Sequence, residues 1–387
     1  MRPVCDGRTK PTLGEILTSH PTLSERKPKT FQNIQVMRGV AALLVVIMHL
    51  LRVVAAFYEQ NGSYAGWIAV IAPHTLPLGL IGVDLFFVIS GFVLFLSARR
   101  SAERGDTGRF ALNRFLRIYP LYWIVFLFSV FSTSFVDPTY PMKAMANWPE
   151  WFLIDVTNRY DVIAAAWTLM YEVYFYAGIV AILLVAPVHL EKALVGWVVV
   201  HLILITLARV GWIGSLNPVT DAILMDFAAG MLIAHFASKG RLPYRRVALL
   251  LCVPMLALGL VFLSTQDQTV QVDRVWRLLT FGVVSVALIY VAVSREQDGR
   301  RMMPSLRWLG DASYSLYIWH LPVFWTLNWT GSRLGIYSFE RPYLTALVWG
   351  AITLATSILS YRWIERPILH WMKKPRTSGA VAPTASL

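Results

Sequence analysis

Long runs of apolar residues recur along the whole chain, separated by short polar segments rich in Lys and Arg. A continuous apolar run of about 18 or more residues is long enough to cross a bilayer as a helix. Outer-membrane barrel strands would instead alternate with a period of two, and these runs do not. The pattern therefore predicts an all-α integral membrane protein, a bundle of about ten transmembrane helices. The expected spans are 35–57, 77–97, 118–136, 163–186, 193–210, 219–237, 247–264, 277–294, 309–330 and 343–364.

The basic residues orient these spans. If the N-terminus lies inside, the predicted cytoplasmic segments contain 25 of the 35 Lys and Arg residues. Cytoplasmic loops of membrane proteins carry such an excess, so both termini are expected in the cytoplasm. The region 187–217 is the least clear part of this topology, because Arg209 lies within a predicted span.

The two ends of the chain differ from the membrane part. Residues 1–34 are polar and basic without apolar periodicity, which predicts a disordered cytoplasmic tail. Residues 369–387 end in small and polar residues, and a second disordered cytoplasmic tail is expected there. The transmembrane domain is expected to cover 35–368. Its first apolar run is too long for a signal-peptide core, so it is interpreted as a retained span.

The composition agrees with a membrane protein and bears on which ligands the chain is expected to bind. The chain is 56% hydrophobic and 15% charged, with a mean hydropathy of +0.55. A net charge of +13 would suit nucleic acid, but the cations occupy short loops where they set topology, so no nucleic-acid partner is expected. Cys5 and Cys252 have no ligand or disulfide spacing, and neither a metal site nor a bound cofactor is predicted.

The first predicted span contains two ionisable residues, which are energetically unfavourable inside a membrane. His49 follows Arg38 by eleven positions, close to three helical turns, which places both on one helix face roughly 16 Å apart along the axis. Ionisable residues inside a membrane normally face a polar cavity and mark function. This helix face is therefore the first candidate for the functional site.

Other ionisable side chains are expected at the depth of His49. Counting inward from the predicted outer ends of the spans places Asp84, Glu172 and His320 with His49 at roughly 10–15 Å depth. These groups would form one buried site in which neutral His49 acts as a general base and a carboxylate orients it. Each residue also has a structural interpretation: interhelical hydrogen bonds for His49 and Glu172, helix packing for Asp84, and a kink at Pro322 for His320.

Arg114 and Arg117 are the candidates for binding an anion. They lie three residues apart, on one helix face at the inner membrane surface, where they could grip phosphates. The alternative is that the six arginines of this loop serve topology alone. Aromatic residues near Glu172, including Tyr176, would wall a pocket. Ser90 is interpreted as a small residue for helix packing beside Gly91.

Six segments resemble motifs of the acyltransferase-three family of integral membrane O-acyltransferases and occur in the order of that family. The resemblance extends over residues 33–368. The segments are Arg38 with His49 after ten intervening residues, Gly82–Phe92, Arg114–Trp123, Trp167–Tyr176, Ser313–Pro322 and Trp363–Pro367. The family modifies bacterial surface polysaccharides, lipopolysaccharide, Nod factors and some small metabolites.

The resemblance implies ten helices in the bacterial inner membrane and a cytoplasmic acyl-CoA donor, most often acetyl-CoA. His49 matches the proposed catalytic histidine and Arg38 its partner in the motif. Arg114 and Arg117 match the segment thought to meet the donor, and Glu172 matches a motif carboxylate. Tyr122, Tyr176 and His320 fall within motifs and are assigned supporting roles.

The implied reaction transfers an acyl group to a hydroxyl of an exopolysaccharide, O-antigen or glycolipid acceptor. Direct transfer is simpler than an acyl-imidazole intermediate, and both stay open. The oligomeric state is open, with a homo-oligomer as one alternative. The competing function is a transporter or flippase for an anionic glycolipid or acyl compound, which would use the same buried groups as its path.

Overall fold

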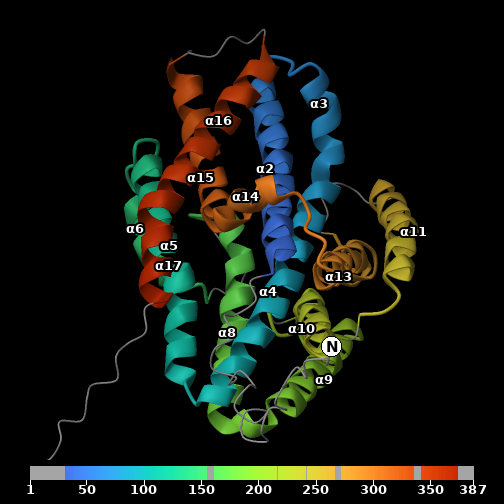
Figure 1. The fold of residues 1–387 in the computed structure, drawn as a ribbon. Coiled ribbons are helices and arrows are strands. Elements are labelled where there is room, and N and C mark those ends of the chain that lie inside the picture. Colours follow the sequence, from blue (N-terminus) through green and yellow to red (C-terminus); the bar gives the residue numbers. More distant parts are fainter. Residues whose placement is uncertain are drawn as a thin grey trace, which may run out of the picture. The chain divides into compact units, whose positions relative to one another are not determined.

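The computed structural model describes residues 31–154, 161–215, 217–240, 242–265, 272–334 and 341–373. The helices that Figure 1 shows belong to the unit Gln32–Leu387. Within the described ranges this unit is helical and contains no strand. The expected all-α class is confirmed.

The helices have the following bounds in chain order. They are α2 (Gln32–Gln60), α3 (Trp67–Ile71), α4 (Leu76–Arg104), α5 (Thr107–Ser134), α6 (Tyr140–Ala146), α7 (Trp148–Trp151), α8 (Trp167–Val185), α9 (Leu190–Arg209), α10 (Leu224–Ser238), α11 (Arg245–Ser264), α12 (Arg274–Arg277), α13 (Val283–Gln297), α14 (Arg307–Asp311), α15 (Ser313–Leu334), α16 (Pro342–Ser360) and α17 (Arg366–Lys373). Two π-helical segments, Leu278–Gly282 and Tyr361–Glu365, join α12 to α13 and α16 to α17.

Every predicted span falls on one of these helices. Within the described residues, eight helical segments are long and apolar enough to cross a membrane. The helices of the other two predicted spans are α10, which has 15 residues, and α15, which has 22 residues but is not among the eight. The total of ten spans and the cytoplasmic location of both termini stay predictions. The predicted tails fall mostly outside the described residues, although α2 already begins at Gln32 and α17 extends to Lys373.

The antiparallel packing of α2 against α4 fixes the relative depth of their side chains (Figure 1). A Cβ atom added at Gly79 would lie 2.3 Å from Met48 Cε, and one added at Gly82 would lie 2.8 Å from the carbonyl oxygen of Ala41. Small residues allow this close approach of backbones in membrane helices. Position 79 is therefore level with position 48, and residues farther along α4 lie progressively closer to the Arg38 end of α2.

Close packing at glycine residues also joins α4 to α10. A Cβ atom at Gly91 would lie 2.1 Å from the carbonyl oxygen of Phe227, and one at Gly230 would lie 2.0 Å from that of Val88. Any side chain at either position would collide with backbone, so these two glycines set the spacing of the pair.

The connection between α5 and α8 folds back to the middle of α5. The hydroxyl of Tyr122, halfway along α5, donates to the carbonyl oxygen of Glu150 at 2.7 Å. The Glu150 carboxylate accepts the backbone N–H groups of Val162 and Ile163 at 3.0 and 3.1 Å. Because these bonds hold the residues just before α8 level with Tyr122, α8 starts near the middle of α5 and not at its Ser134 end. This start decides the depth of Glu172.

Candidate active site

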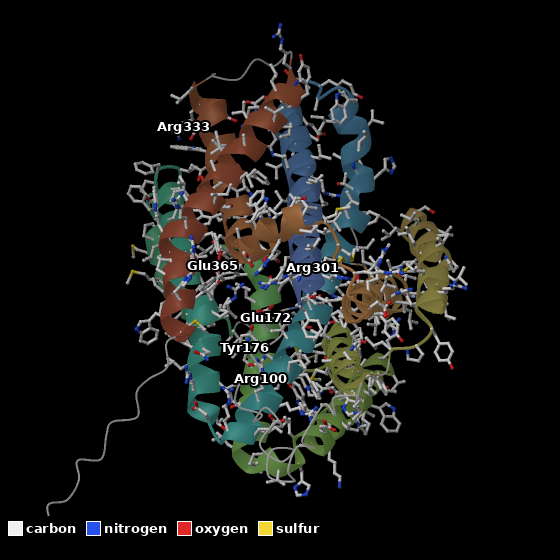
Figure 2. The ribbon with its side chains drawn as sticks, in the orientation of Figure 1. Arg100, Glu172, Tyr176, Arg301, Arg333 and Glu365 are labelled. Carbon is white, nitrogen blue, oxygen red and sulfur yellow. The ribbon has the colours of Figure 1, made fainter. Side chains whose placement is uncertain are left out.

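A polar cavity lies where α2, α4, α5, α8 and α15 meet. Its volume is about 100 Å³, several times the ~10–15 Å³ that one water molecule requires. Figure 2 shows Glu172 and Tyr176 of α8 in the middle of the unit. The polar side chains that line the cavity are Arg38, Ser90, Arg114, Arg117, Thr168, Glu172, Tyr176, Tyr314 and Tyr317.

Glu172 is held by two hydroxyl groups. Ser90 Oγ donates to Glu172 Oε1 at 2.6 Å, and the Tyr176 hydroxyl donates to Oε2 at 2.9 Å. Interpreting Ser90 as a packing residue was therefore wrong, since its hydroxyl orients the carboxylate of this cavity. Tyr176 also lies under a cation, with the Arg114 guanidinium 5.7 Å from its ring centre.

The cavity has an excess of positive charge. Arg117 forms an ion pair with Glu365 at 2.5 Å, and Glu365 also accepts from the Ser315 hydroxyl at 2.7 Å. Arg114 donates to Ser97 Oγ at 3.1 Å, and Arg38 donates to Gln35 Oε1 at 3.3 Å. Three arginines thus face two carboxylates, and two of those arginines bond to neutral side chains. Such a site favours an anionic ligand.

Sequence reasoning missed Glu365, which pairs with the cavity residue Arg117. It belongs to the segment Trp363–Pro367, whose motif was recognised without a role for the carboxylate. The only available signal was a Glu beside a cation-rich helix end, and pairing across 248 positions cannot be inferred from one sequence.

His49 and His320 form a pair about three turns along α2 from Arg38. His320 Nε2 lies 3.2 Å from His49 Nδ1, and the ring centres are 5.0 Å apart. His49 Nδ1 is also 3.0 Å from the carbonyl oxygen of Val45, and His320 Nδ1 contacts the carbonyl oxygen of Tyr317. The expected depth match between these two histidines is confirmed.

These contacts assign the protons on both rings. A carbonyl oxygen only accepts, so the Nδ1 atom of each neutral histidine carries the hydrogen. His320 Nε2 is then an acceptor for the His49 Nδ1–H, and His49 Nε2 is left with its lone pair. Within the described part of the chain this nitrogen makes no hydrogen bond and is not sealed from solvent. His49 therefore offers a basic nitrogen whose orientation is fixed from the other side of the ring.

The two carboxylates expected beside His49 lie elsewhere. Glu172 lines the same cavity as Arg38, which lies roughly 16 Å from His49 along α2, because α8 begins deeper than its hydropathy suggests. Asp84 lies five residues beyond Gly79, which is level with Met48, and so it sits about one to two turns below His49. The single site at one depth was wrong, and His320 with Val45 replaces the expected carboxylate as the partner of His49.

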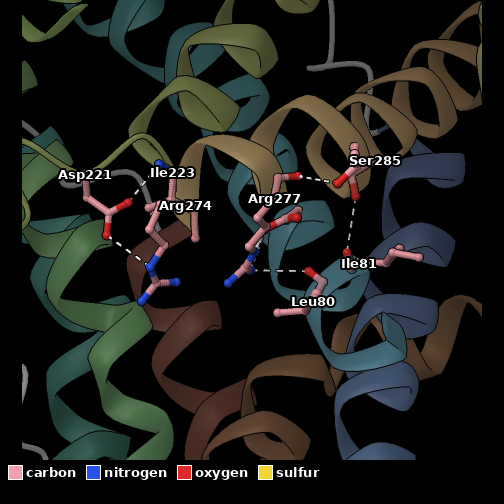
Figure 3. Close-up of polar contacts among 9 residues, drawn as sticks. Leu80, Ile81, Asp221, Ile223, Arg274, Arg277 and Ser285 are labelled. Carbon is pink, nitrogen blue, oxygen red and sulfur yellow. Dashed lines mark hydrogen bonds and ion pairs between the residues drawn. The ribbon is translucent and has the colours of Figure 1, made fainter. Parts of the chain in front are cut away.

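Asp84 belongs to a separate buried ion pair. Its Oδ1 atom accepts from Arg277 Nε at 2.9 Å and from Nη2 at 2.5 Å, and both residues are almost fully buried. Figure 3 shows Arg277 bonding onward to the carbonyl oxygen of Leu80, and Arg274 paired with Asp221 nearby. The cluster joins α4 to α12. Arg277 was missed because it stands at the end of an apolar run.

Tyr122 does not line the cavity. It is fully buried, and its hydroxyl bond to Glu150 ties the α5–α8 connection to α5. Its supporting contribution is to the position of α8. Burial raises the pKa of Glu150 to about 7, against the backbone N–H bonds that lower it.

Aromatic side chains separate the cavity from the histidine pair. Tyr317 lines the cavity, and its ring centre is 5.6 Å from that of His320 and 5.5 Å from that of Phe86. Its hydroxyl is anchored by Thr168 at 2.8 Å and by the carbonyl oxygen of Ala165 at 3.0 Å. Tyr317 and Phe86 thus form the wall between the cationic cavity and His49.

The comparisons with known proteins identify the family of the chain. A family model described as an acyltransferase domain matches residues 31–362. The chain belongs to the acyltransferase-three family. It is therefore an enzyme, an O-acetyltransferase, and the transporter alternative is set aside.

Two relatives illustrate the similarity. The exopolysaccharide production protein ExoZ of Rhizobium meliloti is 27% identical over 339 residues, 81% of this chain and 96% of that protein. The peptidoglycan O-acetyltransferase OatA of Listeria monocytogenes is 25% identical over 345 residues, 78% of this chain and 54% of that protein. The chain thus spans about half the length of OatA. No solved structure matches it.

Proposed function

We propose that this enzyme transfers an acyl group, most often acetyl, from cytoplasmic acyl-CoA to a hydroxyl of a carbohydrate acceptor, with His49 as the general base. One observation carries the proposal: the Nδ1 side of His49 is fixed by Val45 and His320, and its Nε2 atom keeps a free lone pair. A catalytic base needs that combination of correct tautomer and fixed orientation.

The donor enters at the cationic cavity. The diphosphate of acyl-CoA binds Arg114 and Arg117, with Arg38 beside them, because guanidinium groups bind phosphate oxygens through paired charged hydrogen bonds. The roughly 16 Å between Arg38 and His49 is a length that an extended pantetheine arm spans. Because Tyr317 and Phe86 separate the cavity from His49, one of these rings has to move when the arm brings the thioester to His49.

At His49 the acceptor hydroxyl gives its proton to Nε2 while its oxygen attacks the thioester carbonyl. The C–O ester bond forms, the C–S bond breaks, and the CoA sulfur leaves as a thiolate that regains the proton from His49. While His49 is protonated, His320 Nε2 and the carbonyl oxygen of Val45 accept from its Nδ1–H and stabilise the cation. Direct transfer of this kind needs no covalent acyl-enzyme.

The acceptor proposal rests on the relatives. ExoZ is named for exopolysaccharide production and OatA for peptidoglycan O-acetylation, so a surface polysaccharide or its lipid-linked precursor is the acceptor we propose here. With ten spans and both termini in the cytoplasm of a bacterial inner membrane, Arg38 faces the donor side. His49 then lies nearer the outer face.

The test is the substitution His49→Ala. Purified protein is incubated with radiolabelled acetyl-CoA and a polysaccharide fraction from cells lacking the protein, and label in the polysaccharide is counted. We expect at least about a hundredfold loss of transfer, since general-base catalysis contributes on that order, with an unchanged melting temperature. The matched control is His370→Ala, because His370 is exposed on α17 and bonds only to its own helix. Full transfer by His49→Ala protein would refute the proposed role.

A further inference from the structure

A second basic site lies at the turn between α4 and α5, apart from the cavity. It is a groove of about 290 Å³ at the end of α4 and the start of α5. Gly105 makes the turn with a φ of 65°, a conformation that glycine adopts without strain. The groove is lined by Ser97, Arg100, Ser101, Arg104, Asp106, Arg109, Phe110 and Asn113. We propose that it binds the 3′-phosphoadenosine end of acyl-CoA, an inference that rests on the proposed function.

The charges of the loop converge on this groove. Three arginines and one aspartate line it, and the Asp106 carboxylate is engaged with the backbone N–H of Arg109 as the cap of α5. Arg100 uses Nε to bond the carbonyl oxygen of Leu96. Arg104 makes no hydrogen bond or ion pair with the described residues.

Arg99 shows that not every arginine of this loop lies in the groove. It is adjacent to Arg100 but does not line the groove. Its side chain pairs with Glu103 at 3.2 Å and donates to Ser238 at 3.2 Å. Topology requires only positive charge on the inner side, and it does not require three of the loop's six arginines to line one groove with hydroxyl and amide groups.

Arg114 connects the groove to the cavity. Arg114 lines the cavity, and it donates to Ser97 Oγ, which lines the groove. The Arg114 guanidinium also lies 5.4 Å from the ring centre of Phe110, another groove residue. In the view of Figure 2, Arg100, Tyr176 and Glu172 follow one another through the unit. The two basic sites therefore adjoin each other at Arg114.

The spacing of the cations fits the two phosphate-bearing parts of the donor. On α5, Arg109 precedes Arg114 by five residues, about 7.5 Å, and Arg117 lies about 4.5 Å farther. CoA carries a diphosphate and, on the other side of the ribose, a 3′-phosphate. A diphosphate on Arg114 and Arg117 leaves the 3′-phosphate within reach of Arg100, Arg104 and Arg109, while the pantetheine arm points toward His49.

The experiment compares CoA with dephospho-CoA, which lacks only the 3′-phosphate. Their dissociation constants are measured by calorimetry on the purified full-length protein, a readout that needs neither acceptor nor catalysis. We expect wild-type protein to bind CoA on the order of tenfold more tightly, the effect of a charged hydrogen bond to phosphate. Arg104→Gln should weaken CoA binding toward the dephospho-CoA value and leave dephospho-CoA binding nearly unchanged. Added salt should reduce the difference between the affinities of the wild-type protein for CoA and for dephospho-CoA.

The matched control is Arg99→Gln, which removes the same charge from the same loop outside the groove and should keep the preference for CoA. Equal wild-type affinity for the two ligands, or an Arg104→Gln variant that weakens both alike, would overturn the groove assignment and leave the proposed function standing. Failure of the wild-type protein to bind either ligand would instead remove the acyl-CoA donor, and both proposals would fall.

Discussion

Replacing Asp84 with Asn tests whether this carboxylate is structural or part of the chemistry. Asp84 has an exposed fraction of 0% and Arg277 of 3%, and two hydrogen bonds join them. Removing one partner of a buried ion pair costs about 3–5 kcal/mol, because the other charge stays buried without compensation. We therefore expect Asp84→Asn to lower the free energy of unfolding by about 3–5 kcal/mol.

The assay is unfolding of the purified protein in detergent, alongside acetyl transfer per folded molecule. Asp84→Asn should lower the unfolding temperature while transfer per folded molecule stays within a few fold of wild type. The double variant Asp84→Asn with Arg277→Met should recover most of the stability, since removing both charges of a buried pair is often neutral. An Asp84→Asn protein with wild-type stability and abolished transfer would refute this reasoning and place Asp84 in the chemistry.

Two further predictions concern His320 and Glu150. His320→Asn removes the acceptor beside His49 Nδ1 and should lower kcat on the order of tenfold, with little change in the KM for acetyl-CoA. An unchanged kcat would contradict the proposal that His320 positions His49. The pKa of Glu150 is raised to about 7 from 4.5. Between these two pH values the folded state keeps a proton that the unfolded state releases. The free energy of unfolding should therefore be greatest below pH 4.5 and fall as the pH rises to about 7. Thermal melts across pH 4–8 should show this slope in wild-type protein and not in Glu150→Gln; an identical slope in both would exclude Glu150 as its source.

The helical class and the location of the helices could be predicted from the sequence because continuous apolar runs constrain the backbone strongly. Depth within the bundle could not. Counting residues from the end of a run assumes that all helices start at one level, and α8 starts near the middle of α5. Its start is lowered by the bonds of Glu150 and Tyr122, which join segments far apart in the chain.

The candidate site divides in the same way. The spacing of Arg38 and His49 on one helix, and of Arg114 and Arg117 on another, is local and was visible in the sequence. The sequence also placed His49 and His320 at one level, and the structure brings their rings into contact. The partners of Asp84 and Arg117, namely Arg277 and Glu365, depend on which helices are neighbours, and one sequence does not contain that information.

The ion pair between Arg117 and Glu365 has a consequence for how the enzyme is made. Arg117 is synthesised 248 positions before Glu365, the carboxylate that pairs with it. Until the segment Tyr361–Glu365 is inserted, Arg117 lacks its carboxylate and Ser315 lacks its acceptor, so the cavity cannot take its final form. A nascent or truncated chain would hold His49 and His320 without a finished cationic cavity, and acyl transfer would begin only after the segment Tyr361–Glu365 had been inserted.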